Sequence, residues 1–334
     1  MKIYIIHLIK STNEDNRFDV RPTSVSTSFE CQSECACFLT ISDPTMRSSG
    51  CNTNTLPVIH NLLESVRAKT DIPLQKSILN TSLSLIPYEF ILSGTTTTAE
   101  NLISITDARR LGLFSESMNV LVDLKLGNFL GQLHSKVQND WFGVPRLKEP
   151  TDPSYSWQET FTELLENLML SFEKGNIKVD FEIPYEQIRF YHSRAIGFSL
   201  FDDVEVPSLI WLTGSEDDIL VSKPMNPDDP WSFEIRTILP VVTHALWGDP
   251  LLESFFIPPN PTKVMEEGYI SGGGGALAIF PRQNTKRIWY NLFLALLVLH
   301  EIRDQGDEDE RKRRAWCKRT ILSSVDALRE APNY

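Results

Sequence analysis

The sequence predicts an α+β protein of two lobes, with a small strand-rich N-terminal lobe and a mostly helical C-terminal lobe. Short β-prone segments such as Cys37–Ile41 are concentrated in the first part of the chain. Long helical patterns dominate the remainder, and 334 residues are enough to bury a sizeable core. We place the N-terminal lobe at residues 1–92, with residues 1–30 irregular, and the linker and helical lobe at residues 93–334.

The N-terminal lobe is expected to contain short strands and one helix. Residues 10–56 are rich in Ser, Thr, Asn and Cys, a composition typical of short strands joined by turns. Leu56–Thr70 has apolar residues at helical spacing. This helix should end at Asp71-Ile-Pro73, because a residue before proline is disfavoured in the α region. Tyr88–Leu92 is expected to be a further strand.

The C-terminal lobe combines helical periodicity with a few strand-like segments. The expected helices are Leu121–Val137, Trp157–Glu173, Pro184–Gly197 and most of residues 285–331. The expected strands are Ser208–Leu212, Ile219–Val221 and Ile235–Val242, in a small hairpin region that interrupts the helices. Gly272–Gly275 lacks the context of a phosphate-binding loop and is expected to be a flexible surface loop.

Composition excludes several classes of function. The net charge of −12 argues against a nucleic-acid-binding surface, which needs concentrated Lys and Arg. Trp289–Ile302 is the most apolar stretch, but it is shorter than the ~20 residues that a membrane-spanning helix requires. Met1–Ile9 lacks a basic region and a cleavage site typical of a secretion signal. We therefore expect a cytoplasmic protein that binds neither nucleic acid nor membranes.

The five cysteines do not predict a disulfide framework or a metal site. Cys31, Cys35 and Cys37 are closely spaced, but no second Cys or His cluster follows at the spacing of a zinc site. A reduced, partly buried strand is the simpler interpretation, and it agrees with an intracellular location.

Several short motifs keep a constant order from about residue 35 to residue 330. The most specific is Ala245-Leu-Trp-Gly-Asp-Pro250, and Leu126–His134 has the pattern of a helix ending in "LG..L..LH". Arg67–Pro73, Gly268-Tyr269 and Trp289–Arg303 add further matches. Together these segments resemble the aminoglycoside phosphotransferase family, in particular its fungal branch of hygromycin phosphotransferase-like proteins. The resemblance implies a two-lobed protein-kinase-like fold.

Active members of such a family need a small set of charged residues. A Lys on an N-lobe strand holds the nucleotide phosphates, and an Asp orients the acceptor hydroxyl and takes its proton. An Asn in the same loop and an Asp on a later strand supply the hard oxygen ligands that Mg²⁺ prefers. The resemblance therefore implies ATP and Mg²⁺ as cofactors wherever these four residues are present.

Alignment to the family places other residues at most of these positions. Thr40 stands at the Lys, Thr213 at the acceptor-activating Asp and Val241 at the metal-binding Asp. Trp211 replaces a His two residues before Thr213, and Asp218 stands at the metal-binding Asn, where it could still bind a cation. A valine cannot bind Mg²⁺, and the pKa of a threonine hydroxyl is too high for a base near neutral pH. We therefore expect a degenerate member without ordinary phosphotransfer and without a cofactor.

One alternative keeps ATP and Mg²⁺ by moving the metal site to the acidic run Glu216-Asp217-Asp218. The simpler interpretation of this run is a solvated acidic turn between two strands. His244, beside the degenerate metal strand, is a further candidate acid or base. His134 is expected to be structural, since it ends an apolar helix face.

Large aromatic residues gather in the region that would face the acceptor. Trp141, Trp157, Trp211 and Trp247 are candidates for the walls of a small-molecule pocket, although an ordinary core would use the same residues. The leading hypothesis is a kinase-fold protein reused to bind or convert a small molecule in fungal secondary metabolism, for example by promoting a cyclisation or cycloaddition. The alternatives are a phosphotransferase with a displaced metal site and a non-catalytic pseudokinase that binds another protein.

Overall fold

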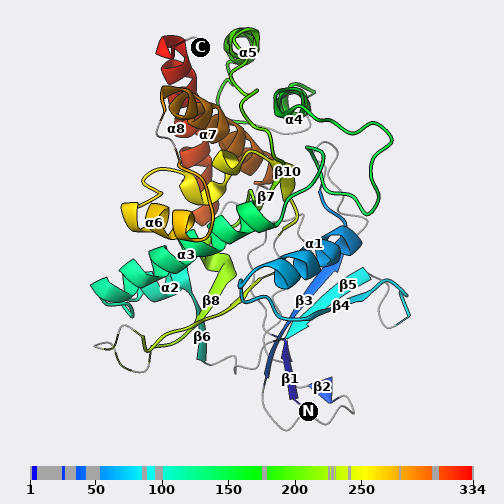
Figure 1. Cartoon of the computed structure of the whole chain (residues 1–334), viewed down its shortest axis with the longest axis vertical. Coiled ribbons are helices and arrows are strands. Elements are labelled where there is room, and N and C mark those ends of the chain that lie inside the picture. The colour runs from blue at the N-terminus through cyan, green and yellow to red at the C-terminus, as the bar shows by residue number, and fades with distance from the viewer. Residues whose placement is uncertain are drawn as a thin grey trace.

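The chain forms a strand-rich N-terminal region and a mainly helical C-terminal region, the α+β arrangement that the sequence predicts (Figure 1). This computed structural model describes residues 2–5, 25–26, 35–42, 53–84, 89–94, 101–174, 179–224, 226, 229, 231–239, 242–277, 280–302 and 308–332. Cys31, Val241 and the side chains of Cys35 and Cys37 lie outside the described part.

The N-terminal region is a five-stranded sheet with the order β2-β1-β3-β5-β4. Its strands are β1 (Lys2–Ile5), β2 (Val25–Ser26), β3 (Cys35–Ser42), β4 (Ser77–Asn80) and β5 (Glu89–Gly94). Helix α1 (Leu56–Lys69) packs on this sheet, where Ile59 and Leu63 form an apolar cluster with Ile91 of β5. The predicted helix ends where expected, since Thr70 already has extended backbone angles before Pro73.

The C-terminal region contains seven helices in the described part of the chain. They are α2 (Ile105–Arg110), α3 (Glu116–Lys136), α4 (Trp157–Glu173), α5 (Tyr185–Gly197), α6 (Lys263–Ser271), α7 (Pro281–Glu301) and α8 (Glu308–Glu330). Ser104, Ser115, Ser156 and Thr262 cap helices by accepting a hydrogen bond from the first turn. The Ser115 cap starts α3 five residues before the predicted start. None of the described helices is long and apolar enough to span a bilayer.

The C-terminal region also contains two small sheets, and their strand pairing differs in part from the prediction. β7 (Ser208–Ile210) pairs with β10 (Leu246–Gly248), and β8 (Ile219–Ser222) lies between β6 (Leu102–Ser104) and β9 (Ile235–Ile238). Strands therefore form in all three predicted segments, but β7 ends at Ile210 and β9 at Ile238, before the predicted ends at Leu212 and Val242. In addition, β7 joins a different sheet from β8 and β9. Helices α2 and α6 were not predicted, because both are short and α2 follows directly on a strand.

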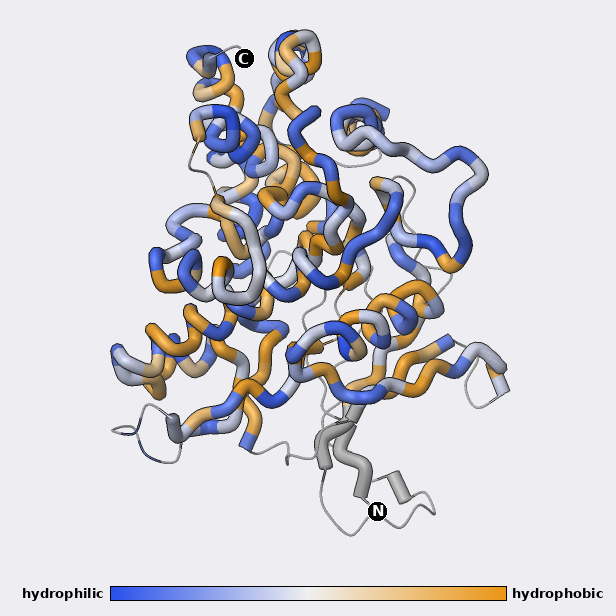
Figure 2. Tube along the Cα trace, in the orientation of Figure 1, coloured by the Kyte–Doolittle hydropathy of each residue, from blue (hydrophilic) through white to orange (hydrophobic). Residues whose placement is uncertain are grey.

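Two apolar cores organise the C-terminal region. One joins α3 to α1, to the small strands and to α6, and the other surrounds α7 with α4 and α8. Hydrophobic and hydrophilic positions alternate along α1 and α3 in Figure 2, as expected for helices with one buried face. Helix α7 is buried on nearly all sides, in agreement with its very apolar sequence.

Helices α3 and α6 are in backbone contact through four glycines. A Cβ at Gly127 or Gly131 of α3 would overlap the carbonyl oxygen of Met265 or Tyr269, and a Cβ at Gly268 or Gly272 would overlap a carbonyl of α3. The first residue of the Gly272–Gly275 run is thus buried against α3, which corrects the prediction of a surface loop throughout. Only residues without a side chain permit this distance between the two helices.

A buried histidine makes the stability of the second core depend on pH. His192 lies among the rings of Phe161, Phe201 and Trp289, and burial lowers its pKa to about 4. Because the unfolded chain binds a proton near the ordinary pKa of 6.5 and the folded chain does not, the free energy of unfolding should fall as pH decreases from 6.5 towards 4, by on the order of 3 kcal/mol in total.

Urea unfolding at a series of pH values measures this effect. In the window from pH 6.5 to 5, the variant His192→Leu should show a smaller slope than the wild-type protein, and His300, whose pKa burial also lowers, should contribute to the slope that remains. An unchanged slope in His192→Leu would assign the pH dependence to other groups.

Candidate functional site

The loop after β7 holds an unusual backbone turn. Leu212 has a φ of +68°, and the amide of Thr213 donates to the carbonyl oxygen of Trp211 at 2.9 Å. This three-residue turn is strained for a bulky residue, at a cost of about 1–3 kcal/mol. The turn leaves Thr213, the residue aligned with the acceptor-activating Asp, half-buried at its end.

The surrounding structure holds this loop from several sides. The buried carboxylate of Glu253 accepts the amide of Trp211 at 2.9 Å, and the Ser254 hydroxyl donates to the carbonyl of Gly214 at 2.8 Å. The Trp211 ring lies so close to Gly214 that any Cβ there would overlap it. These contacts compensate the strain at Leu212.

Glu253 belongs to a buried polar network that reaches α3 and α6. The two ring nitrogens of His134 contact the Tyr269 hydroxyl at 2.9 Å and a carboxylate oxygen of Glu253 at 3.4 Å. Glu253 is completely buried and His134 is 2% exposed. His134 is therefore a structural residue, as the sequence predicts, because it ties the end of α3 to the segment that supports the Trp211 loop.

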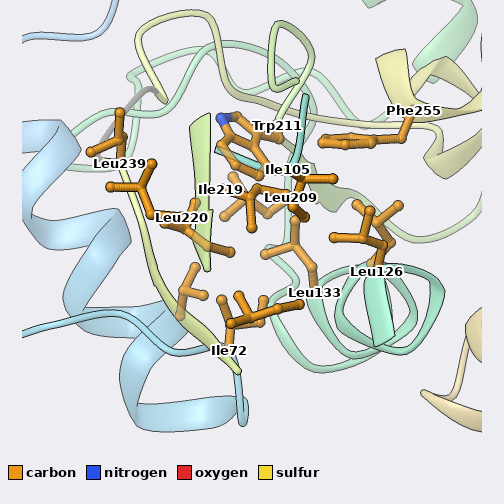
Figure 3. Packing of buried hydrophobic residues seen from close by; sticks show 14 of the residues in the cluster. Ile72, Ile105, Leu126, Leu133, Leu209, Trp211, Ile219, Leu220, Leu239 and Phe255 are labelled. Carbon is orange, nitrogen blue, oxygen red and sulfur yellow. The ribbon is translucent and has the colours of Figure 1, made fainter. Parts of the chain in front are cut away.

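An apolar cavity of about 40 Å³ lies beside this loop. Its walls come from both regions of the chain: Leu63, Val66, Ile72, Leu74, Leu133, Leu209, Trp211, Ile238, Leu239 and Val242. Figure 3 shows Ile72, Leu133, Leu209, Trp211 and Leu239 among the packed side chains of this apolar cluster, and all five line the cavity. The volume exceeds the ~10–15 Å³ that one water molecule occupies, but the lining offers no polar partner for water. Such a space favours an apolar group.

The acidic run after the loop is not a solvated turn, which corrects one prediction. Glu216–Asp218 forms a 3₁₀ turn, η3, and Asp218 is only 4% exposed. Its carboxylate accepts hydrogen bonds at 3.0 Å from the amide and hydroxyl of Ser215, so it caps the turn. Glu216 pairs with Arg109 of α2 at 3.0 Å, and Arg109 also binds Asp123 of α3 at 2.6 Å.

These pairings reduce the capacity of the acidic run to bind a cation. Burial raises the pKa of Glu216, and Arg109 supplies a positive charge where a metal ion would otherwise be needed. Among the described residues, no group of three or more His, Cys, Asp or Glu side chains is arranged to hold a metal.

The remaining candidate residues occupy different places. Thr40 is buried on β3 opposite Ile91 of β5, in the N-terminal sheet. His244 is buried and its Nε2 pairs with the carboxylate of Glu301 at the end of α7; it is not among the residues that line the cavity. Val241 lies outside the described residues.

The four candidate tryptophans separate into two cores. Trp141, Trp211 and Trp247 share the first core, but only Trp211 lines the cavity. Trp157 is 1% exposed in the second core, where its indole donates to the Tyr290 hydroxyl at 2.8 Å. Trp157 is thus a packing residue of α4 rather than part of the cavity wall.

Most of the cavity wall was not identified from the sequence. Leu63, Val66 and Leu133 have the helical spacing of ordinary core positions. The sequence alone does not distinguish a residue that lines a cavity from one in a fully packed core. The pairing of Arg109 with Glu216 and the role of Glu253 were not predicted, because both depend on partners far away in the sequence.

No protein-family model matches this chain, and no curated protein matches it either. Solved structures with the same fold do exist. A "putative aminoglycoside phosphotransferase" from Ralstonia eutropha JMP134 matches with a TM-score of 0.56 and 11% identity, over 89% of this chain and 87% of that one. This similarity shows the kinase-like fold shared with that structure.

Two further solved structures match this chain with lower TM-scores. A choline/ethanolamine kinase family protein from Mesorhizobium loti has a TM-score of 0.47 at 13% identity, over 88% of this chain and 87% of that one. A hygromycin B complex of the aminoglycoside phosphotransferase APH(4)-Ia has a TM-score of 0.48 at 14% identity, over 88% and 92% of the two chains.

Proposed function

We propose that this protein is a kinase-fold protein that no longer carries out ordinary phosphotransfer and that binds a small apolar molecule. The observation that carries the proposal is the apolar cavity beside the Trp211–Ser215 loop. Ten apolar side chains from both regions converge there, at the loop that holds Thr213. Sites for small molecules are concave and mostly apolar, so a ligand with an apolar group fits this lining better than a phosphate does.

The electrostatics around the loop support the loss of phosphotransfer. Thr213 offers no carboxylate to accept a proton, and the Asp218 carboxylate already caps its own turn. Glu216 is paired with Arg109. These residues do not fit ATP and Mg²⁺ held in the ordinary way, because charge neutralisation by metal ions is central to phosphoryl transfer.

The finer part of the proposal concerns conversion of the ligand. Because its volume is about 40 Å³, the cavity would hold only one end of a flexible apolar molecule. Fixing that end between aromatic and aliphatic walls restricts the molecule towards a reactive conformation, which lowers the barrier of a cyclisation or cycloaddition. Trp211 supplies a flat wall for such a substrate. An intermediate of fungal secondary metabolism is the substrate class that the sequence resemblance suggests.

Binding of a terpenoid alcohol such as farnesol tests the first part. We expect farnesol to quench tryptophan fluorescence in the wild-type protein, and Val66→Phe, which fills the cavity, to weaken binding at least tenfold. Ile78→Phe, at a position 61% exposed on β4, is the matched control and should bind as the wild type does. Equal affinities for all three proteins would place the ligand elsewhere and overturn the proposal.

A thermal-shift measurement with ATP and Mg²⁺ separates the proposal from its main alternative. Ligands that bind only the folded state raise the melting temperature, so we expect no shift at millimolar nucleotide. A clear rise that Asp218→Ala abolishes would favour a phosphotransferase with a displaced metal site. A stable complex with another protein, formed without any small molecule, would favour the pseudokinase alternative.

A further inference from the structure

Helix α8 packs one side against α7 and α5 and leaves its other side exposed. The buried side includes Cys317, Ile321, Val325 and Leu328, which belong to the second core. These residues recur at intervals of three or four, so they form one stripe along the helix. Figure 1 shows α8 beside α7, at the opposite end of the molecule from the N-terminus. The side of α8 away from this stripe therefore faces solvent.

The solvent-exposed side of α8 is basic. From Arg311 to Val325 the sequence contains six Lys or Arg residues and no Asp or Glu. Lys312 and Arg319 are exposed on the same face of the helix, since seven residues are close to two turns, and Lys318 is exposed at the edge of this face. This stretch is strongly positive in a chain whose net charge is −12.

Internal contacts neutralise the start of the basic stretch more than its middle. Near the start, Glu310 pairs with Arg314 at 3.0 Å. Among the described residues Arg319 forms no ion pair, and Lys318 lies over the ring of Phe181, at 5.6 Å from its centroid. A ring does not neutralise an ammonium group as a carboxylate does. The charges of Lys318 and Arg319 can therefore attract an anionic group of another molecule.

Acidic residues lie at both ends of the basic stretch. Glu308 and Asp309 precede it and approach Lys312 at 3.7 and 3.8 Å, and Asp326 and Glu330 follow it. The stretch between them is about 20 Å long, because a helix rises 1.5 Å per residue. A long nucleic acid or a flat anionic membrane would also meet the acidic ends, where like charges repel. A short anionic segment would contact only the cations.

Two apolar residues lie between the cations. Leu322 is 38% exposed, and Ala315 is exposed on the same face, one turn before Arg319. The stems of Lys and Arg side chains add further apolar surface. A protein segment can supply carboxylates and an apolar side chain together, whereas a polyphosphate supplies only charge. The composition of this face therefore favours a protein partner.

We propose that the outer face of α8 binds a short acidic helix of a partner protein. Carboxylates of that helix would pair with Lys318 and Arg319, and a guanidinium can bind a carboxylate through two parallel hydrogen bonds. An apolar side chain between these carboxylates would cover Leu322. None of the three residues lines the apolar cavity beside Trp211, so a partner on α8 is compatible with a ligand in that cavity.

Fluorescence anisotropy with a labelled peptide of two Glu-Glu-Leu-Ala-Glu-Glu-Leu repeats tests this surface. We expect the full-length protein to bind the peptide, and the affinity to fall at least tenfold from about 50 to about 300 mM NaCl, because salt screens exposed charges. The same peptide with glutamine in place of glutamate should bind at least tenfold more weakly.

A double variant identifies the cations that hold the peptide. Lys318→Gln/Arg319→Gln should bind the acidic peptide at least tenfold more weakly than the wild type does. Lys69→Gln/Lys263→Gln is the matched control, because it removes the same charge from exposed positions at the end of α1 and the start of α6. This control should bind as the wild type does, so an effect of net charge alone is separated from an effect of α8.

Four results would overturn the proposal. They are no binding of the acidic peptide, equal affinity for its glutamine counterpart, equal losses in the two double variants, or tighter binding of single-stranded DNA or phosphatidylserine vesicles than of the peptide. The last result would make α8 a general polyanion surface.

Two measurements keep the test independent of folding and of the cavity. Thermal melting identifies a folding defect in either double variant. In the wild-type protein the peptide should shift the indole resonance of Trp316, which is partly buried on α8, and an unshifted resonance would contradict the proposal. Val66→Phe, in which the cavity is filled, should bind the peptide normally, so this test and the farnesol test can fail separately.

Discussion

Replacing Glu253 with alanine is expected to lower the free energy of unfolding by about 3–5 kcal/mol, since the change breaks a buried charged network. The Glu253 carboxylate accepts hydrogen bonds from the amides of Trp211 and Ser254 and contacts His134. Alanine would leave these groups buried without their acceptor. Burial also lowers the pKa of Arg287 to about 10, and the negative charge of Glu253 opposes this shift.

Urea unfolding of Glu253→Ala measures this loss, and farnesol binding measures its effect on the site. Because Glu253 holds the strained turn at Leu212, we expect Glu253→Ala to weaken farnesol binding even in the fraction that stays folded. Glu64→Ala is the control: Glu64 forms a surface pair with Arg67 one turn away on α1, and its loss should change stability very little. Similar losses in both variants would contradict a special role for the network.

Replacing Gly127 with alanine should lower the free energy of unfolding by about 2–3 kcal/mol, although alanine is the better helix former. Alanine in place of glycine inside a helix ordinarily stabilises by up to about 1 kcal/mol. At Gly127 the added methyl group would overlap the carbonyl oxygen of Met265, which belongs to the backbone of α6. A backbone atom cannot rotate away as a side chain can, so α3 and α6 must separate.

The matched control is Gly197→Ala at the end of α5, where an added Cβ meets nothing within 4 Å. This variant should be as stable as the wild type or slightly more so. We expect changes of opposite sign in the free energy of unfolding for Gly127→Ala and Gly197→Ala. This difference distinguishes the effect of the α3–α6 contact from the effect of helix propensity. A stabilising effect at Gly127 would show that α3 and α6 are not in backbone contact in solution.

Sequence patterns predicted most of the regular structure because local forces decide it. Leu56–Lys69 and Tyr185–Gly197 follow the apolar spacing and the prolines beside them, and they match the prediction closely. Helix α2 escaped prediction, since six residues are too few for a periodic pattern. The pairing of β7 with β10 also escaped, because partners distant in the chain leave no local signal.

The candidate site was much less predictable than the fold. The sequence made Thr213 a candidate site residue but placed Leu212 in a strand, and the strained turn at Leu212 depends on Glu253 and Gly214. The burial of Asp218 was not predictable from the sequence, because a carboxylate in a run of acidic residues is expected to be exposed to solvent. Here the capping bonds from Ser215 compensate its burial.

By itself, the sequence determined the α+β class and the order of the main helices. These properties are local, because each follows from residue type, spacing and the position of a motif along the chain. Tertiary structure alone decided where the apolar cavity lies, that Arg109 neutralises Glu216, and that four glycines bring α3 and α6 together. Each of these properties joins groups far apart in the chain, and their distances are set only when the elements pack.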